Sequence, residues 1–437
     1  MKLWIFVTLL VASFGARAEP NPVPVELPVV DAPFNFLDDS FVGPSMRQSL
    51  ALSTGFYETT HRAIMGDGEK KSGRVWRHFA IAGFDILTTW VPLGSSWLHE
   101  EWHRAVMTRR GISSYDDIND FPFGRSLIAV SHVTDDDLVR LKRDHPAEQV
   151  RLSAAGMEAQ ESQNLLIESH QFFHGAPANN RFLLWYNKFG VIGYLATCAG
   201  DQADTNTNKQ NTDDGSDVGK RDFTGLDCTA WVYDLFRPDE AYATRGTHPS
   251  GVGIDRYIRY SDLSEAEKRF LGRQVYLSAL NFVDPFLIGY DRFEMSIGSR
   301  TISYVPRLSH QITSFGYVVD AHLMVQFGRH NMHFQLHNGF NDRVYFPGFS
   351  LKVIEFPLTG RLSLSPSLTI WNQPKRQRYN AKAGELLTAA GLEASYRHSD
   401  RLRTFIGVEA KSPGWMAGQV FVDRAWQTMV GARLNVF

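Results

Sequence analysis

The sequence has few cysteines, little net charge and no long uninterrupted apolar run beyond its N-terminus. Cys198 and Cys228 are the only cysteines in 437 residues, and neither has a C-x-x-C partner, which argues against a redox motif or a cysteine-rich zinc site. The formal net charge of −2 leaves no basic footprint for nucleic acid. A glycine-rich phosphate loop, a nucleophile elbow and internal repeats are also missing from the sequence.

The N-terminus predicts export. Lys2 is followed by the apolar run LWIFVTLLVASFG and then by Ala16-Arg17-Ala18, the pattern of a signal peptide with an A-x-A cleavage site. We therefore expect residues 1–18 to be removed and residues 19–45, which are rich in proline, to form an extended arm. No later segment predicts a membrane-spanning helix, because the two most apolar stretches, 80–98 and 182–200, contain charged residues or proline.

In an exported chain a single pair of cysteines most often forms one disulfide. We expect Cys198 and Cys228 to be joined. Between them, residues 201–221 are polar and show no apolar periodicity, so the sequence predicts a mobile loop there.

The hydrophobic period changes from helical to alternating near residue 290. In RLSLSPSLTIW (361–371), YVVDAHLMVQF (317–327) and MHFQLHNGF (332–340), apolar and polar residues alternate. A soluble sandwich would alternate too, but these strands have the length needed to cross a membrane at a tilt, and aromatic residues recur near their ends. Residues 290–437 resemble a bacterial outer-membrane β-barrel of about 8–10 strands.

Such a barrel would carry polar residues on its inner face. Three histidines fall on the predicted inner face, and they are either a second metal site or polar groups satisfied by their neighbours: His322, His333 and His337.

One motif carries chemistry. In WLHEEWHRAVMTRRG (97–111), His99 and His103 are four residues apart, so on a helix both imidazoles project from one face. Two nitrogens at that spacing can bind one zinc ion, with Glu100 placed to take a proton from the attacking water. Gly111 suits the end of such a helix.

The five-residue core His-Glu-x-x-His resembles the signature of the zincin metallopeptidases, whereas Glu101 and Arg104 depart from that family's wider pattern. The resemblance implies zinc bound by His99 and His103, Glu100 as the general base, and a third ligand, commonly a glutamate on a later helix. Pro146 suits the first turn of such a later helix, and Thr134 or Asp135 can cap the helix before it.

The later helix contains a patch of small residues, Ser153-Ala154-Ala155-Gly156, which would let another helix approach closely. Glu158 follows this patch and is the expected third ligand. Glu161 is the expected supporting or substitute ligand, and Glu168 is a more distant choice.

Together these features predict an α+β chain with an all-α zincin-like domain at 46–289 and a C-terminal antiparallel transmembrane barrel at 290–437. We expect an outer-membrane zinc-dependent hydrolase, most simply a peptidase, with outer-membrane lipid and a polypeptide substrate as partners, no nucleic acid, and a periplasmic helical domain. Two alternatives stay open: a non-catalytic barrel with a helical plug or docking domain, and a zinc-dependent lipid-modifying hydrolase, for which Trp90, Trp97 and Trp102 near the motif are the reason.

Overall fold

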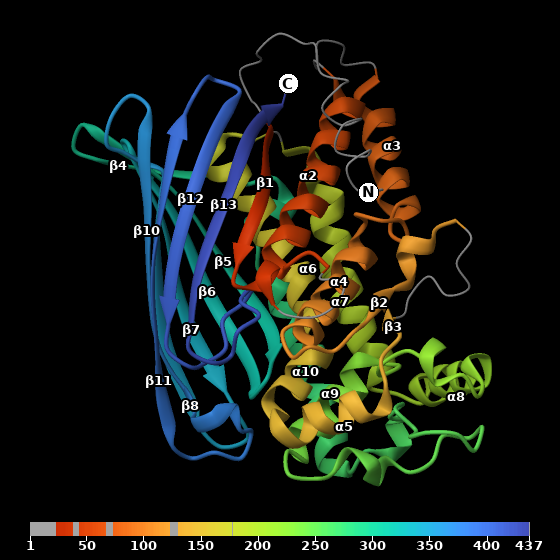
Figure 1. Cartoon of the computed structure of the whole chain (residues 1–437). Helices are drawn as coiled ribbons and strands as arrows, with labels where there is room; N and C mark the ends of the chain where they lie inside the picture. Colours follow the sequence, from red (N-terminus) through yellow and green to blue (C-terminus); the bar gives the residue numbers. More distant parts are fainter. Residues whose placement is uncertain (1–22, 38–42, 67–72, 123–129, 177, 437) are drawn as a thin grey trace.

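The chain folds as a layer of helices packed against one large antiparallel sheet (Figure 1). The fold is therefore a mixed α+β fold, as the sequence predicts. The expected signal peptide lies outside the residues that this computed structural model describes, which are 23–37, 43–66, 73–122, 130–176 and 178–436.

The helical layer contains the segments between the first strand and the rest of the sheet. Its helices are α2 Met46–Met65, α3 Arg74–Leu87, α4 Ser95–Thr108, α5 Asp135–Asp144, α6 Pro146–His174, α7 Arg181–Cys198, α8 Gln202–Asp214, α9 Asp227–Phe236 and α10 Glu265–Ser278.

The large sheet has 11 strands in the order β1-β13-β12-β11-β10-β8-β7-β6-β5-β4, with β9 paired to β10. A two-stranded sheet, β2 Tyr115–Asp116 with β3 Val130–Ser131, lies apart from it. The strands of the large sheet are β1 Val23–Ala32, β4 Phe293–Ile297, β5 Arg300–Thr313, β6 Gly316–Phe327, β7 His330–Phe340, β8 Tyr345–Ile354, β9 Phe356–Pro357, β10 Leu362–Pro374, β11 Gly384–Arg397, β12 Leu402–Lys411 and β13 Ala425–Val436.

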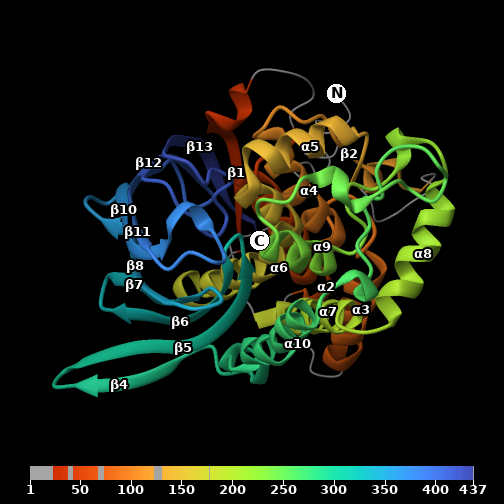
Figure 2. The ribbon, with the colours of Figure 1, turned by 90° about the horizontal axis from the view of Figure 1, so that it is seen from below.

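The sheet is not closed as a barrel, which differs from the sequence-based expectation. Its edges are β1 and β4, and within the described residues these two strands do not pair. The helical layer contacts strands at both ends of the sheet, β1 through α2 and α6, and β5 through α6 and α10. Figure 2 shows the sheet curving around one side of the helices, which occupy the side where its edges would otherwise meet.

Part of the proline-rich arm belongs to the sheet. Residues Val23–Ala32 form β1, which pairs antiparallel with β13 from Val23↔Val436 to Ala32↔Thr428. The arm is extended, as expected, but it is hydrogen-bonded to the far end of the chain. Proline is tolerated in β1 because this strand is at an edge, where one side of the backbone has no strand to pair with.

The polar run between the cysteines is also more ordered than expected. It contains helix α8, whose buried residues are Ala203, Thr207 and Asn211. These residues recur every four positions and so form one face. Because the buried face consists of small and polar side chains, the sequence shows no apolar period there.

The two faces of the large sheet have opposite character. On β6, Asp320 and His322 point inward and are buried, whereas Leu323 on the other face is 37% exposed. Ion pairs continue along the inner face, for example between the half-buried side chains of Arg433 and Glu393. A cavity of about 540 Å³ lies between this inner face and α6. The alternation predicted from the sequence is present, with the polar residues inside.

The core of the helical layer is apolar. Leu98, Trp102 and Val106 of α4 pack with Leu152 and Ala155 of α6. None of the helices in the described ranges is both long enough and apolar enough to cross a membrane.

Candidate metal centre

Helix α4 carries both histidines of the motif. His99 and His103 lie one turn apart on the face of α4 that packs against α6, with 4.9 Å between their ring centroids. Leu98 and Trp102, which precede the two histidines in the sequence, are fully buried in the apolar core and hold the helix in this orientation.

Gly156 of α6 makes room for the first histidine. A Cβ atom at position 156 would lie 2.2 Å from Cδ2 and Nε2 of the His99 ring, far closer than van der Waals contact allows. The small-residue patch predicted from the sequence therefore allows a close approach of two helices, and the group that fills the space is an imidazole.

The backbone of α6 orients the second histidine. Nδ1 of His103 donates a hydrogen bond to the carbonyl oxygen of Leu152, so in the neutral ring Nε2 carries no proton and can act as a ligand. Nε2 is buried and makes no well-aligned hydrogen bond in the described part of the protein, and the Asp227 carboxylate lies 3.3 Å from it as an ion-pair partner. An imidazole held by a backbone carbonyl, with its other nitrogen aimed into a polar cluster, is the usual arrangement of a metal ligand.

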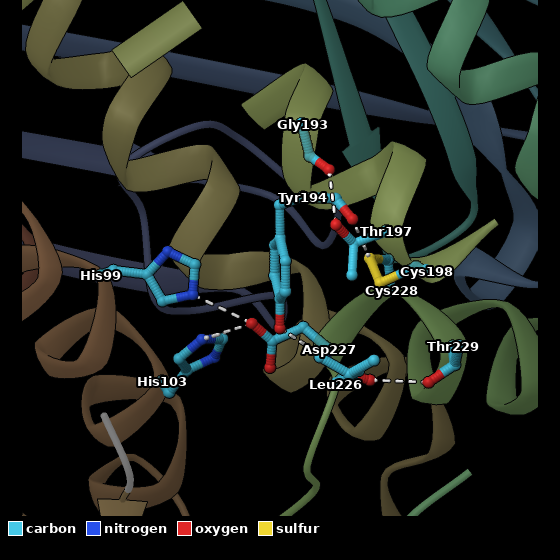
Figure 3. Close-up of a disulfide and its surroundings, with 10 residues drawn as sticks. All are labelled: His99, His103, Gly193, Tyr194, Thr197, Cys198, Leu226, Asp227, Cys228 and Thr229. Carbon is cyan, nitrogen blue, oxygen red and sulfur yellow. Dashed lines mark hydrogen bonds and ion pairs between the residues drawn. A yellow bond between two sulfur atoms is a disulfide. The ribbon is translucent and has the colours of Figure 1, made fainter. Parts of the chain in front are cut away.

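A third ligand group comes from α9. Oδ2 of Asp227 lies 2.9 Å from Nε2 of His99 and 3.3 Å from Nε2 of His103 (Figure 3). The potential ligand atoms of these three residues all lie within 4.8 Å of one another, and no other group of three such residues is found in the described ranges. Two histidine nitrogens and one carboxylate oxygen form a ligand set that suits zinc and leaves a coordination position open.

The disulfide holds Asp227 in place. Cys228, the next residue, is bonded to Cys198 of α7, as the sequence predicts, with 6.0 Å between their Cα atoms. The backbone N–H of Asp227 donates to the hydroxyl of Tyr194, also on α7, at 2.9 Å, and the Tyr194 ring packs edge-on against His99. The first turn of α9 is thus fixed to α7 by a covalent bond and a hydrogen bond (Figure 3).

The charges of the three residues depend on one another. Burial lowers the pKa of His99. Burial also opposes protonation of His103, but the neighbouring Asp227 carboxylate outweighs it and raises the pKa of His103 to about 9. Burial alone would raise the pKa of Asp227, yet the two histidines hold it below its usual range. His103 and Asp227 therefore form a buried ion pair within the cluster.

The two glutamates of the motif differ in their surroundings. Glu100 is buried beside the cluster, and burial raises its pKa well above the usual range of a glutamate. A divalent cation nearby would favour its ionised form. Glu101 instead forms a buried ion pair with Arg104 at 2.6 Å. The two residues that depart from the zincin pattern therefore neutralise each other's charge inside the fold.

Glu158, the expected third ligand, lies outside this cluster. Its carboxylate accepts hydrogen bonds from Arg151 at 2.9 Å, from the Trp415 indole N–H at 3.1 Å and from the Gly418 N–H at 2.8 Å. Residues 156 and 158 are about 200° apart around the helix axis, so Gly156 faces α4 while Glu158 faces the sheet. The structure brings Asp227, and not Glu158, to the two histidines.

Glu161 and Glu168 also face the sheet. Both pair with Arg307 of β5, and Glu168 lies 3.7 Å from Lys188 of α7. Neither carboxylate is available to the histidines of α4.

Asp227 was not found by the sequence argument, although a signal for it exists. It directly precedes Cys228, and the disulfide predicted from the cysteine pair brings α9 beside α7 and α4. The search for a third ligand was restricted to the next long helix. It therefore missed a carboxylate that lies next to a disulfide-bonded cysteine.

The histidines of the sheet form hydrogen-bonded pairs. His322 bonds to His333, with 3.1 Å between Nδ1 and Nε2, and to the Ser309 hydroxyl, while His337 bonds to Asp320 at 2.9 Å. In the described residues they do not converge with a third ligand group. The sequence left two interpretations open, a second metal site or polar groups that bond to their neighbours. This arrangement agrees better with polar groups that bond to their neighbours.

Fold and site together define an α+β protein whose helical layer holds a two-histidine, one-aspartate cluster. Neither the comparison with protein-family models nor the comparison with curated proteins gives a match to this chain. The functional argument therefore depends on the site itself.

Proposed function

We propose that this chain is a zinc-dependent hydrolase whose metal is held by His99, His103 and Asp227. The observation that carries the proposal is the convergence of two imidazoles on one buried carboxylate: Nε2 of His99 and Nε2 of His103 lie 2.9 Å and 3.3 Å from Oδ2 of Asp227. Three convergent ligand atoms fit the group, and they come from helices that packing and a disulfide hold in place.

Zinc at such a site supplies Lewis acidity, which polarises a carbonyl oxygen and makes water a nucleophile at neutral pH. Glu100 would take the proton from the attacking water and return it to the leaving amine. The Leu152 carbonyl would keep His103 in the tautomer that leaves Nε2 free. Gly156 would let His99 sit against α6, and Tyr194 would hold the backbone of Asp227.

The preferred substrate class is a polypeptide, as the motif implies. The lipid alternative depended on three tryptophans near the motif, and two of them, Trp97 and Trp102, are buried in the core, whereas Trp90 is partly exposed. The tryptophans next to the histidines therefore serve packing and do not offer a lipid-binding surface at the site.

We also propose that the outer face of the large sheet contacts lipid in an outer membrane. Large apolar side chains are exposed along it, among them Leu336, Ile370, Ile406 and Trp426, while charged residues such as Arg433 are paired on the inner face. A sheet in water has the opposite arrangement, with the apolar face buried. The helices that occupy its open side take the place of the missing strands.

The test of the metal site is zinc analysis of the purified protein together with single substitutions. Wild-type protein should carry about one zinc per chain, and Asp227→Ala should lose it as completely as His99→Ala does. Glu100→Gln should keep the metal and lose about 10²–10⁴-fold in peptide hydrolysis, because it removes the base and not a ligand.

Glu158→Gln is the matched control, since it alters an equally buried carboxylate on the other side of α6. It should keep its zinc. Protein that binds no zinc when purified with zinc present would contradict the proposal and favour the non-catalytic alternative. Zinc lost in Glu158→Gln but kept in Asp227→Ala would show that the ligand set is wrong.

A further inference from the structure

Helix α3 exposes an apolar face on the side of the molecule away from the large sheet. Its large apolar residues Val75, Trp76, Phe79, Ile86 and Leu87 are from 51% to 78% exposed. At 100° per residue they fall within about 120° of the helix circumference, so they form one continuous stripe.

The opposite face of α3 packs against the protein through Ile81, which is buried, and Phe84, whose ring contacts those of Phe56 and Tyr57. Asp85, its only acidic residue, is completely buried and bonds to His61 of α2, which in turn bonds to Asn180. An ordinary surface helix buries its apolar stripe and exposes its charges. Helix α3 instead carries apolar residues on both faces, and its one acidic residue lies on the buried face.

The exposed apolar surface continues from α3 toward the sheet. Helix α3 packs beside α7, which exposes Phe189, and α7 contacts the short helix η9 (Pro285–Ile288), where Ile288 is exposed. Next to η9 begins the β4–β5 hairpin, which exposes Met295 and Ile297. Figure 2 shows α3, α7 and β4 toward one side of the molecule, with α10 between α7 and the sheet.

We propose that this apolar belt, defined as the exposed apolar residues of α3, α7, η9 and β4, lies against the hydrocarbon and headgroup region of a lipid bilayer. The helical layer is then membrane-embedded on this side and is not a separate periplasmic domain. The proposal rests on the membrane part of the proposed function and is independent of the metal.

Three features favour lipid over a protein partner. The belt turns from the helices onto the sheet, so no single flat partner surface could cover it, whereas lipid surrounds a molecule from all sides. Trp76 lies near one end of α3 and Trp90 just beyond the other, the positions that amphipathic rings take at membrane interfaces. The lack of an exposed carboxylate on α3 suits anionic phosphate headgroups.

The orientation of α3 agrees with that of the strands. In Figure 1, α3 and α2 run roughly along the direction of the strands of the large sheet. A single bilayer crossed by the strands would therefore meet α3 from the side. Because α3 is too short to span, it would be immersed along one face only.

Site-directed spin labelling in phosphatidylcholine vesicles tests this inference on the full chain. The native cysteines are joined, so an introduced cysteine is the one free thiol to label. The belt positions are Phe79→Cys and Phe189→Cys. The sheet position is Val408→Cys, which is exposed on the outer face of β12 beside Ile406. Lys209→Cys on the polar helix α8 is the water-exposed control.

Labels at Phe79 and Phe189 should be relaxed more strongly by oxygen, which partitions into lipid, than by a water-soluble nickel chelate. The label at Lys209 should show the reverse order. If the Phe79 and Phe189 labels behave like the Lys209 label, the belt does not contact lipid and the inference is overturned.

The Val408 label distinguishes an error in the belt proposal from an error in the proposed membrane contact of the large sheet. A lipid signal at Val408 with a water signal at Phe79 would overturn the belt alone and leave the sheet in the membrane. Protection of Phe79 from both reagents would show that protein, such as a second copy of the chain, covers α3, which also overturns the inference. Zinc content measured on the same samples reports on the metal site separately.

Discussion

The buried carboxylates on the two sides of helix α6 have different charge partners. Toward the large sheet, Glu158, Glu161 and Glu168 are each paired with arginine, from Arg151 or Arg307. Toward α4 and α9, the buried carboxylate of Asp227 is surrounded by histidines and has no arginine or lysine partner in the described part of the chain. An arginine keeps its charge at all working pH values, whereas a histidine can release its proton to solvent when it binds a metal.

This difference separates a structural carboxylate from a candidate ligand. A carboxylate neutralised by arginine is already satisfied, and recruiting it to a metal would leave the guanidinium buried and uncompensated. When a cation binds a carboxylate that is paired with histidine, the histidine releases its proton to solvent and no buried charge is left unpaired. Burial and proximity to a helix crossing, which suggested Glu158 from the sequence, do not distinguish the two cases.

The largest effect on the sheet side is expected from Glu158→Gln. The substitution leaves Arg151 buried without its charge partner, which should lower the free energy of unfolding by about 3–5 kcal/mol. Denaturant unfolding measures this loss. A variant as stable as wild type would show that the pair is not buried in the folded protein, and the contrast between the two faces of α6 would fail.

Removing the disulfide should have a similar effect on stability and an additional effect on the metal. Cys198→Ala with Cys228→Ala opens a loop with a sequence separation of 30, which costs about 3–4 kcal/mol in the chain-entropy model. Because Asp227 precedes Cys228, zinc affinity should fall as well. Thermal unfolding and zinc titration of the same variant measure the two effects, and unchanged zinc affinity would show that the disulfide does not position Asp227.

Gly156→Ala tests the α4 side directly. The added Cβ would displace the His99 ring, so zinc affinity should fall by at least about 10–100-fold, the range found when the support of a ligand is removed. Competition with a chelator measures this change. Normal zinc affinity in this variant would mean that His99 does not need its position against α6.

The smallest effect is expected from Gly193→Ala on α7, the matched glycine control. A Cβ at position 193 meets nothing within 4 Å, so the substitution should leave zinc affinity unchanged and stabilise the protein by at most about 1 kcal/mol through helix propensity. If Gly193→Ala loses as much zinc affinity as Gly156→Ala, the loss in both variants results from a change in the helices, and the contact with His99 is not its cause.

Much of the local structure could be predicted from the sequence. Thr134 caps α5 and Pro146 opens α6, as expected, and α4 carries the motif. These features depend on residues within one or two turns of each other, so the sequence order already places them together. The alternation along the strands is equally local, because neighbouring side chains of a strand point to opposite faces.

The arrangement of the sheet could not be predicted in the same way. The pairing of β1 with β13 joins the two ends of the chain, and no local pattern encodes it. Alternation specifies which residues share a face, but it does not specify whether the last edge meets another strand or a helix. The strands and their two faces were predicted, whereas the open edges and the helices beside them are tertiary features.

The candidate site also combines features that the sequence predicts with features that the tertiary structure sets. The sequence by itself determined that His99 and His103 share a helix face, that Glu100 stands beside them, and that Cys198 and Cys228 would be joined. Only the tertiary structure decided which carboxylate completes the cluster. Asp227 is 128 positions from His99 in the chain, and it reaches the histidines through the packing of α9 against α6 and the disulfide to α7. Glu158 is nearer in sequence, but the rotation of α6 points it toward the sheet, because helix geometry gives residues two positions apart nearly opposite directions.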